Sequence, residues 1–131
     1  MAKDFKDYEH MRDAFVDAVT DLAEKDDRIV MLDADLSVCV NSGCFQEKYP
    51  DRFFNIGISE ADMVGVAAGL SSTGLIPFAH TFACFASRRA FDQFFLSANY
   101  AKQNVKLVGT DPGITSQMNG GTHMPFEDFG I

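Results

Sequence analysis

The stretch Asn55-Ile-Gly-Ile-Ser-Glu-Ala-Asp-Met-Val-Gly-Val-Ala-Ala-Gly69 joins a short apolar segment to a segment with helical spacing. Ser59 is a favoured residue type for a helix N-cap, and Asp62 three positions later provides an acidic variant of the capping box. The pattern therefore predicts that a helix begins at Glu60, directly beyond the end of a strand. On capping grounds alone, a glutamate at this position also complements the helix dipole, which is worth about 0.3–1 kcal/mol at an exposed site.

Two further features of this stretch concern packing around the helix start. Ile58 and Met63 occupy the two positions of a hydrophobic staple. Gly65 and Gly69 stand four apart and lack side chains, so that another backbone or a ring can approach this helix closely. We therefore expect the helix to be fixed at its start and accessible along one face.

Working outward, helical spacing and short apolar runs alternate along the whole chain. We expect helices near 11–22, 44–49, 60–71 and 91–98, and strands near 29–32, 53–56, 75–79 and 105–108. This alternation predicts a single α/β domain over 1–131, a three-layer αβα sandwich around a mostly parallel sheet. Ligands of such sheets bind beyond the carboxyl ends of the strands. Pro125 followed by acidic residues resembles a helix start, so we expect the domain to continue beyond Ile131.

Composition narrows the classes of partner. The 131 residues carry a formal charge of -8 and a pI near 4.6, which argues against nucleic acid and anionic membranes. There is no apolar run of about 20 residues, and the amino terminus lacks the apolar core of a secretory signal, so the cytoplasm is the expected location. The three cysteines form no paired motif; we expect reduced thiols and no metal site.

A second informative segment is His80-Thr-Phe-Ala-Cys-Phe-Ala-Ser-Arg-Arg-Ala-Phe-Asp-Gln93, where Phe82 and Phe85 stand three apart after an expected strand. A third is Gly120-Gly-Thr-His-Met-Pro125. Together with the glutamate that opens a glycine-containing helix, these segments resemble the pyrimidine-binding domain of the transketolase family. The resemblance extends from Arg12 to Ile131.

This resemblance implies a thiamine diphosphate site to which the chain supplies the pyrimidine end. The aminopyrimidine would stack on phenylalanines, and Glu60 would hydrogen-bond the ring nitrogen opposite the amino group and so activate the cofactor. By the same resemblance, His123 would face the reacting carbons. The implied cofactor contacts are Asp35, Ile58, Glu60, Phe82, Phe85 and Arg88, and the implied substrate contacts are Arg12, Asn119 and His123.

The chain departs from the family pattern in two places. It lacks the Gly-Asp-Gly motif with a later Asn that holds Mg²⁺ and the diphosphate, so these would be held by a partner chain. That partner would be a diphosphate-binding transketolase subunit or domain in a homo- or hetero-oligomer, and the isolated chain would be inactive. The substrate loop also differs, with Asp111, Met118-Asn119 and Cys39 at positions where the family carries other residues, which leaves the sugar open.

Three functions remain compatible with these residues. The first is the pyrimidine-binding part of a transketolase-type enzyme that transfers a two-carbon ketol unit between sugar phosphates. The second is another thiamine diphosphate enzyme, similar to deoxyxylulose-phosphate synthase or to the beta subunit of a 2-oxo acid dehydrogenase. The third is a noncatalytic interaction fragment, with exposed apolar residues at its carboxyl end. Thr122-His123 and the Thr-Phe-x-x-Phe segment favour the first.

Overall fold

A computed structural model of the chain describes residues 10–131. Within them, four parallel strands form one sheet with the order β2-β1-β3-β4. The first strand thus has β2 on one side and β3 followed by β4 on the other. The arrangement confirms the predicted α/β fold with a parallel sheet. The strands are β1 (Ile29–Asp33), β2 (Phe53–Asn55), β3 (Ile76–Phe82) and β4 (Lys106–Thr110).

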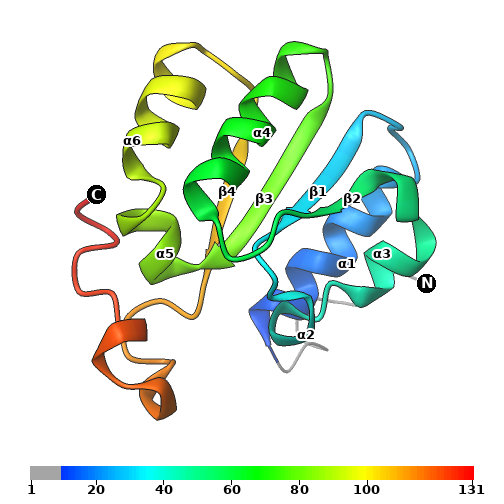
Figure 1. Cartoon of the computed structure of the whole chain (residues 1–131). Coiled ribbons are helices and arrows are strands. Elements are labelled where there is room, and N and C mark those ends of the chain that lie inside the picture. The colour runs from blue at the N-terminus through cyan, green and yellow to red at the C-terminus, as the bar shows by residue number, and fades with distance from the viewer. Residues whose placement is uncertain (1–9) are drawn as a thin grey trace.

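Helices cover both faces of the sheet, giving three layers (Figure 1). Side chains alternate across β1, so that Met31 packs with residues of α1 and α3, whereas Leu32 packs with Met63 of α4 on the opposite face. All five residues of β1 are buried, as expected for a central parallel strand. The elements on one face are α1 (Met11–Ala23), α2 (Ser37–Val40) and α3 (Gly43–Lys48), followed by a 3₁₀ turn, η2 (Pro50–Arg52). The remaining helical elements are α4 (Glu60–Ser72), α5 (Ala83–Arg88), α6 (Phe91–Gln93), the π-helical turn η3 (Phe94–Tyr100), and the 3₁₀ turns η4 (Gln117–Asn119) and η5 (Gly121–His123).

The third strand is longer than the sequence predicts. It continues through His80 and Thr81 to Phe82, and both polar residues are fully buried. Pro77 lies within this central strand but before the ladder with β4, which begins at Phe78. The missing N–H of the proline is therefore not needed by that ladder. The consequence is that β3 delivers polar side chains directly to the carboxyl edge of the sheet.

Three local expectations were wrong. Ser59 occupies the N-cap of α4, but its side chain makes no capping hydrogen bond. Ile58 is 72% exposed, so no hydrophobic staple forms with Met63. The segment after Pro125 forms bends and a turn, where the sequence suggested the start of a helix. The amino-terminal end of α4 is thus fixed by contacts other than a side-chain cap or a hydrophobic staple.

No helix in residues 10–131 is long and apolar enough to cross a membrane. The three cysteines are free thiols: Cys39 and Cys44 are exposed, whereas Cys84 is buried and burial raises its pKa.

Candidate functional site

The candidate site lies where β3 ends and α4 begins. Glu60 is the first residue of α4, which follows β2, and Thr81 and Phe82 are the last two residues of β3. Phe85 follows on α5, and His123 reaches the same place from η5. Three stretches that are separate in the sequence, the start of α4, the β3–α5 junction and η5, therefore meet at the carboxyl edge of the sheet, where ligands of parallel sheets bind.

Glu60 is a buried carboxylate held by two donors. Its side chain is 2% exposed, and both carboxylate oxygens accept hydrogen bonds from Nη1 of Arg89, at 3.1 and 2.9 Å. The hydroxyl of Thr81 lies 3.4 Å from Oε1 and donates the remaining contact. A buried carboxylate needs such partners, because an unpaired buried charge is strongly unfavourable.

An aromatic cluster adjoins this carboxylate. The rings of Phe82 and Phe85 have centroids 6.2 Å apart and are tilted by 50°. His123 meets both rings edge-on, at 5.8 and 5.1 Å, and its Nδ1 lies 2.9 Å from the hydroxyl of Thr122. The guanidinium of Arg89 lies over the ring of Phe85, with its central carbon 3.9 Å from the centroid. The structure thus brings Glu60, Phe82, Phe85 and His123 together.

The two consecutive arginines on α5 have different partners. Arg88 points to the carboxyl-terminal segment, where it donates to the carbonyl of Thr122 at 3.2 Å and pairs with Glu127 at 3.2 Å. Arg89 makes the contacts with Glu60 and Phe85. The sequence predicts Arg88 as the arginine beside Phe85. It shows two consecutive arginines, but no sequence feature distinguishes them.

Two predicted cofactor contacts lie near the site but apart from the aromatic cluster. Asp35 has a left-handed backbone (φ 63°) after β1, and its carboxylate accepts a hydrogen bond from the amide of Asn55 at 3.0 Å. The side-chain oxygen of Asn55 in turn accepts from the backbone of Gly57 at 2.9 Å. This linkage joins the loops after β1 and β2. Ile58 lies in the second loop and is solvent-exposed.

The predicted substrate contacts lie on two other segments. Arg12, in the first turn of α1, has its Nη1 3.6 Å from Oδ1 of Asp111, which follows β4. Asp111 also has a left-handed backbone (φ 53°), and its other carboxylate oxygen is buried and has no hydrogen-bond partner in the described part of the chain. Asn119 is exposed at the end of η4. The cofactor and substrate roles of all these residues remain predictions.

A buried polar pair beneath the edge of the sheet was not predicted. His80 and Asp33 face each other across β3 and β1, with 3.5 Å between Nδ1 and a carboxylate oxygen, and both are fully buried. Burial lowers the pKa of His80 to about 4 and raises the pKa of Asp33, although Asp33 also accepts hydrogen bonds from the backbone of Leu36.

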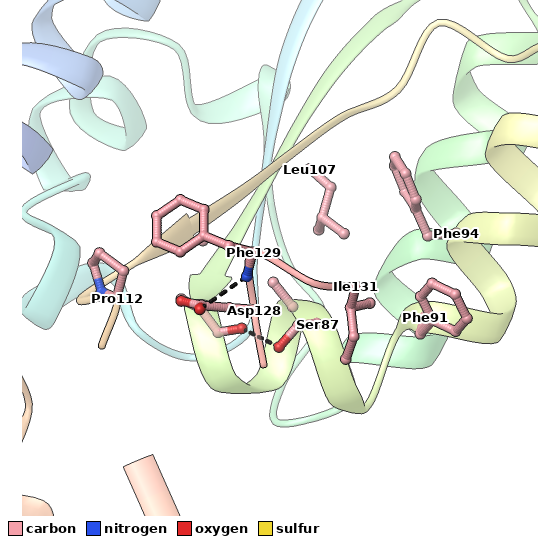
Figure 2. A pocket seen from close by; sticks show the side chains of 11 residues that line it. Ser87, Phe91, Phe94, Leu107, Pro112, Asp128, Phe129 and Ile131 are labelled. Carbon is pink, nitrogen blue, oxygen red and sulfur yellow. Dashed lines mark hydrogen bonds between the residues drawn. The ribbon is translucent and has the colours of Figure 1, made fainter. Parts of the chain in front are cut away.

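A cavity of about 400 Å³ adjoins α5, the helix that carries Phe85, but does not contain the site. Figure 2 shows side chains that line this cavity. It is bounded by β4, α5, the helical segment from Phe91 to Phe94, and the carboxyl-terminal residues. Its walls are mainly apolar, and none of them is Glu60, Phe82 or Phe85. The side chains lining it include Phe91, Phe94, Leu107, Pro112, Phe129 and Ile131.

Comparison with known proteins defines the class. Residues 8–131 match the family model for the transketolase pyrimidine-binding domain, and the chain therefore belongs to this family. Its members are parts of thiamine diphosphate-dependent transferases. The fold is also that of transketolase from Campylobacter jejuni, with a TM-score of 0.82 over 91% of this chain and 19% of that one, at 22% identity.

Particular relatives are subunits of transketolases. The chain is 54% identical, over 92% of its length, to a 6-deoxy-6-sulfo-D-fructose transketolase subunit of Clostridium sp. strain MSTE9, and covers 38% of it. It is 42% identical over 95% of its length to a putative transketolase C-terminal section of Methanocaldococcus jannaschii, covering 39% of that protein. A solved split-gene transketolase, described as an inactive beta4 tetramer, matches with 45% identity and a TM-score of 0.76 over 89% of this chain and 37% of that one.

The chain therefore spans less than two fifths of the length of these relatives. The relatives favour transketolase over the two alternative thiamine diphosphate enzymes and over a noncatalytic module.

Proposed function

We propose that this chain supplies the pyrimidine-binding part of a split transketolase-type enzyme, in which Glu60 is the catalytic carboxylate. The observation that carries the proposal is a buried carboxylate at the carboxyl edge of the sheet, 2% exposed, next to the paired rings of Phe82 and Phe85. A purely structural glutamate at a helix start is normally solvated. Burial beside two aromatic faces suits a carboxylate that receives a hydrogen bond from a flat nitrogen heterocycle.

The residues of the site fit such a ring. The guanidinium of Arg89 is flat, carries N–H donors, lies on the face of Phe85 and donates to Glu60. A planar nitrogen-bearing group is therefore accommodated between these two residues in this chain. When bound, thiamine diphosphate supplies the carbanion chemistry that makes and breaks the carbon–carbon bond of a ketose. Glu60 would hold a proton shared with the ring, and Phe82 and Phe85 would orient the ring and exclude water from the carboxyl group.

The diphosphate and Mg²⁺ would be bound by a partner chain. Residues 10–131 contain no group of three His, Cys, Asp or Glu side chains placed to hold a metal ion. Relatives that are themselves sections or split genes of transketolase support a two-chain enzyme. Arg88 and Asp35 would contact the cofactor from the loops at the rim, and His123 would face the reacting carbons.

For the sugar substrate, the class and the acidic group are proposed. We propose a ketose that carries a phosphate or a sulfonate at the end remote from the carbonyl, with Arg12 as a contact of that anion. The sulfonate is included because the relative with 54% identity is named for 6-deoxy-6-sulfo-D-fructose. The location at which the enzyme acts is proposed to be the cytoplasm.

The test is reconstitution with a diphosphate-binding transketolase subunit, thiamine diphosphate and Mg²⁺. We expect ketol transfer to an aldose acceptor, assayed in parallel with fructose 6-phosphate and with 6-deoxy-6-sulfofructose as donors. Glu60→Gln should lower the rate at least about a hundredfold, the usual size of a lost acid–base group. The matched control is Asp62→Asn, an exposed carboxylate in the same turn of α4. Full activity of Glu60→Gln would contradict the assigned role.

A further inference from the structure

Arg89 occupies the place at which two elements of the proposed pyrimidine site meet. Its Nη1 lies 2.9 and 3.1 Å from the two carboxylate oxygens of Glu60, and the central carbon of its guanidinium lies 3.9 Å from the centre of the Phe85 ring. It thereby uses the same carboxylate and one of the same aromatic faces that the ring of the cofactor would need. The guanidinium and the cofactor ring cannot occupy this position, on the Phe85 face and against the Glu60 carboxylate, at the same time.

The two members of this ion pair differ in their freedom to move. Glu60 is anchored in the first turn of α4 and is 2% exposed, whereas the Arg89 side chain is 48% exposed at the end of α5. An arginine can leave a half-exposed position at low cost, because its head group regains water. A buried carboxylate that loses its partner has no such compensation. The pair therefore can open only if another donor replaces the guanidinium at Glu60.

We propose that Arg89 is a place-holder for the aminopyrimidine ring: it stacks on Phe85 and neutralises Glu60 until the ring enters and displaces it. This inference rests on the proposed function. It makes Arg89 a competitor of the cofactor within its own site, so the apparent affinity for the ring is reduced by the fraction of chains in which the ion pair is open. It also gives Arg89 a stabilising role in the chain without cofactor.

The first test needs no cofactor. Unfolding by urea is measured for the wild-type chain, Glu60→Gln, Arg89→Gln and the double variant. We expect Arg89→Gln to raise the unfolding equilibrium constant much more than Glu60→Gln, because it leaves a buried carboxylate unpaired. The unfolding equilibrium constant of the double variant should be at least tenfold smaller than the value expected if the two single effects were independent. Additive effects would show that the ion pair is absent in solution and would overturn the inference.

The matched control removes the same charge elsewhere. Arg28 is an exposed arginine that pairs with Asp26 in the turn before β1, remote from α5 in the sequence. Arg28→Gln should combine additively with Glu60→Gln. Coupling of the same size in this control would assign the effect to net charge instead of to the pair.

The second test uses the ring alone. 4-Amino-5-hydroxymethyl-2-methylpyrimidine, the pyrimidine half of thiamine, is titrated into isotope-labelled chain, and the amide resonances of Glu60, Phe82 and Phe85 are followed. We expect Arg89→Gln to bind the ring about tenfold more tightly than the wild-type chain, and Arg28→Gln to bind as the wild type does. Equal or weaker binding by Arg89→Gln would overturn the place-holder role and leave the proposed function intact. Absence of binding in every variant would count against the proposed function itself, while the coupling of the first test would still stand.

Discussion

The imidazole of His80 lies 3.5 Å from the carboxylate of Asp33, and neither side chain is exposed to solvent. Among residues 10–131, neither ring nitrogen of His80 has a hydrogen-bond partner, and the ring of Phe15 on α1 packs edge-on against it at 6.3 Å. Burial lowers the pKa of His80, because it removes the hydration that would stabilise the imidazolium. The pair lies on the opposite side of β3 from Thr81, and it makes the stability of the sheet depend on pH.

The first prediction concerns this pH dependence. The pKa of His80 is lowered to about 4 in the folded chain from 6.5 in the unfolded chain. Between these values the unfolded chain binds a proton that the folded chain does not, so the free energy of unfolding falls as the pH drops from about 6.5 towards 4. The loss through His80 should be on the order of 3 kcal/mol. Urea unfolding at pH 7 and at pH 4.5 measures it.

The control for this prediction is His80→Gln, which cannot titrate. The raised pKa of Asp33 acts in the opposite sense, because the folded state favours its protonated form and acidification stabilises through that group. The difference in pH dependence between wild type and His80→Gln therefore isolates the contribution of the histidine. Identical pH profiles for the two chains would contradict the prediction.

The second prediction concerns the close approach of β4 to α5. A Cβ atom at Gly109 would lie 2.9 Å from the Cα of Ala83, a backbone atom that cannot move aside easily. Gly109→Ala should therefore destabilise the chain by about 1–3 kcal/mol. Gly65→Ala is the opposite case, since outside the backbone of α4 itself no atom of the described residues lies within 4 Å of the added Cβ, and it should stabilise by about 0.5–1 kcal/mol. Thermal unfolding of both variants decides; equal effects would refute the steric argument.

Much of the fold follows from local patterns in the sequence. Ile29–Leu32 is a continuous apolar run, and it is the buried centre of the sheet. The helix predicted to begin at Glu60 begins there. The capping argument used to place it was nevertheless wrong, because the Ser59 side chain makes no cap bond. The apolar spacing of Met63 and Ala67, and not the cap, is what holds this helix against the sheet.

The parts that could not be predicted depend on contacts between distant segments. The polar groups of His80 and Thr81 at the end of β3 face Asp33 and Glu60, which are 47 and 21 residues away. No local pattern reveals such partners. Similarly, neighbouring residues on a helix differ in direction by about 100°. Whether Arg88 or Arg89 reaches Phe85 is therefore decided by how α5 sits on β4, which only the structure reveals.

The third prediction concerns the hydroxyl of Thr81. It lies 3.4 Å from Oε1 of Glu60 and is fully buried, so it is placed to orient the carboxyl group once the cofactor binds. In the reconstituted enzyme, Thr81→Val, which keeps the shape and removes the donor, should lower kcat about tenfold. Thr81→Ser should retain most of the activity, because it keeps the hydroxyl. Loss of activity in Thr81→Ser but not in Thr81→Val would refute a role for the hydrogen bond.

The fourth prediction concerns Arg12 and Asp111. Their 3.6 Å ion pair is partly exposed, with side chains 32% and 20% exposed, and is therefore worth little to stability. If Arg12 binds the anionic end of the sugar, Asp111 competes with that anion for the same guanidinium. Asp111→Asn should then lower KM for a phosphorylated or sulfonated ketose several-fold, and asparagine tolerates the left-handed backbone at this position. Arg12→Gln should raise KM about tenfold with kcat nearly unchanged.

Steady-state kinetics with a charged ketose donor and with erythrulose, an uncharged donor, separate binding of the anionic group from a general effect of the substitutions on the site. Erythrulose carries no phosphate or sulfonate, so neither substitution should change its KM by more than the error of measurement. The free energy of unfolding of both variants should stay within about 1 kcal/mol of the wild type, since the pair is partly solvated. Parallel changes of KM for charged and uncharged donors would show that Arg12 supports the fold of the site and does not contact the anion.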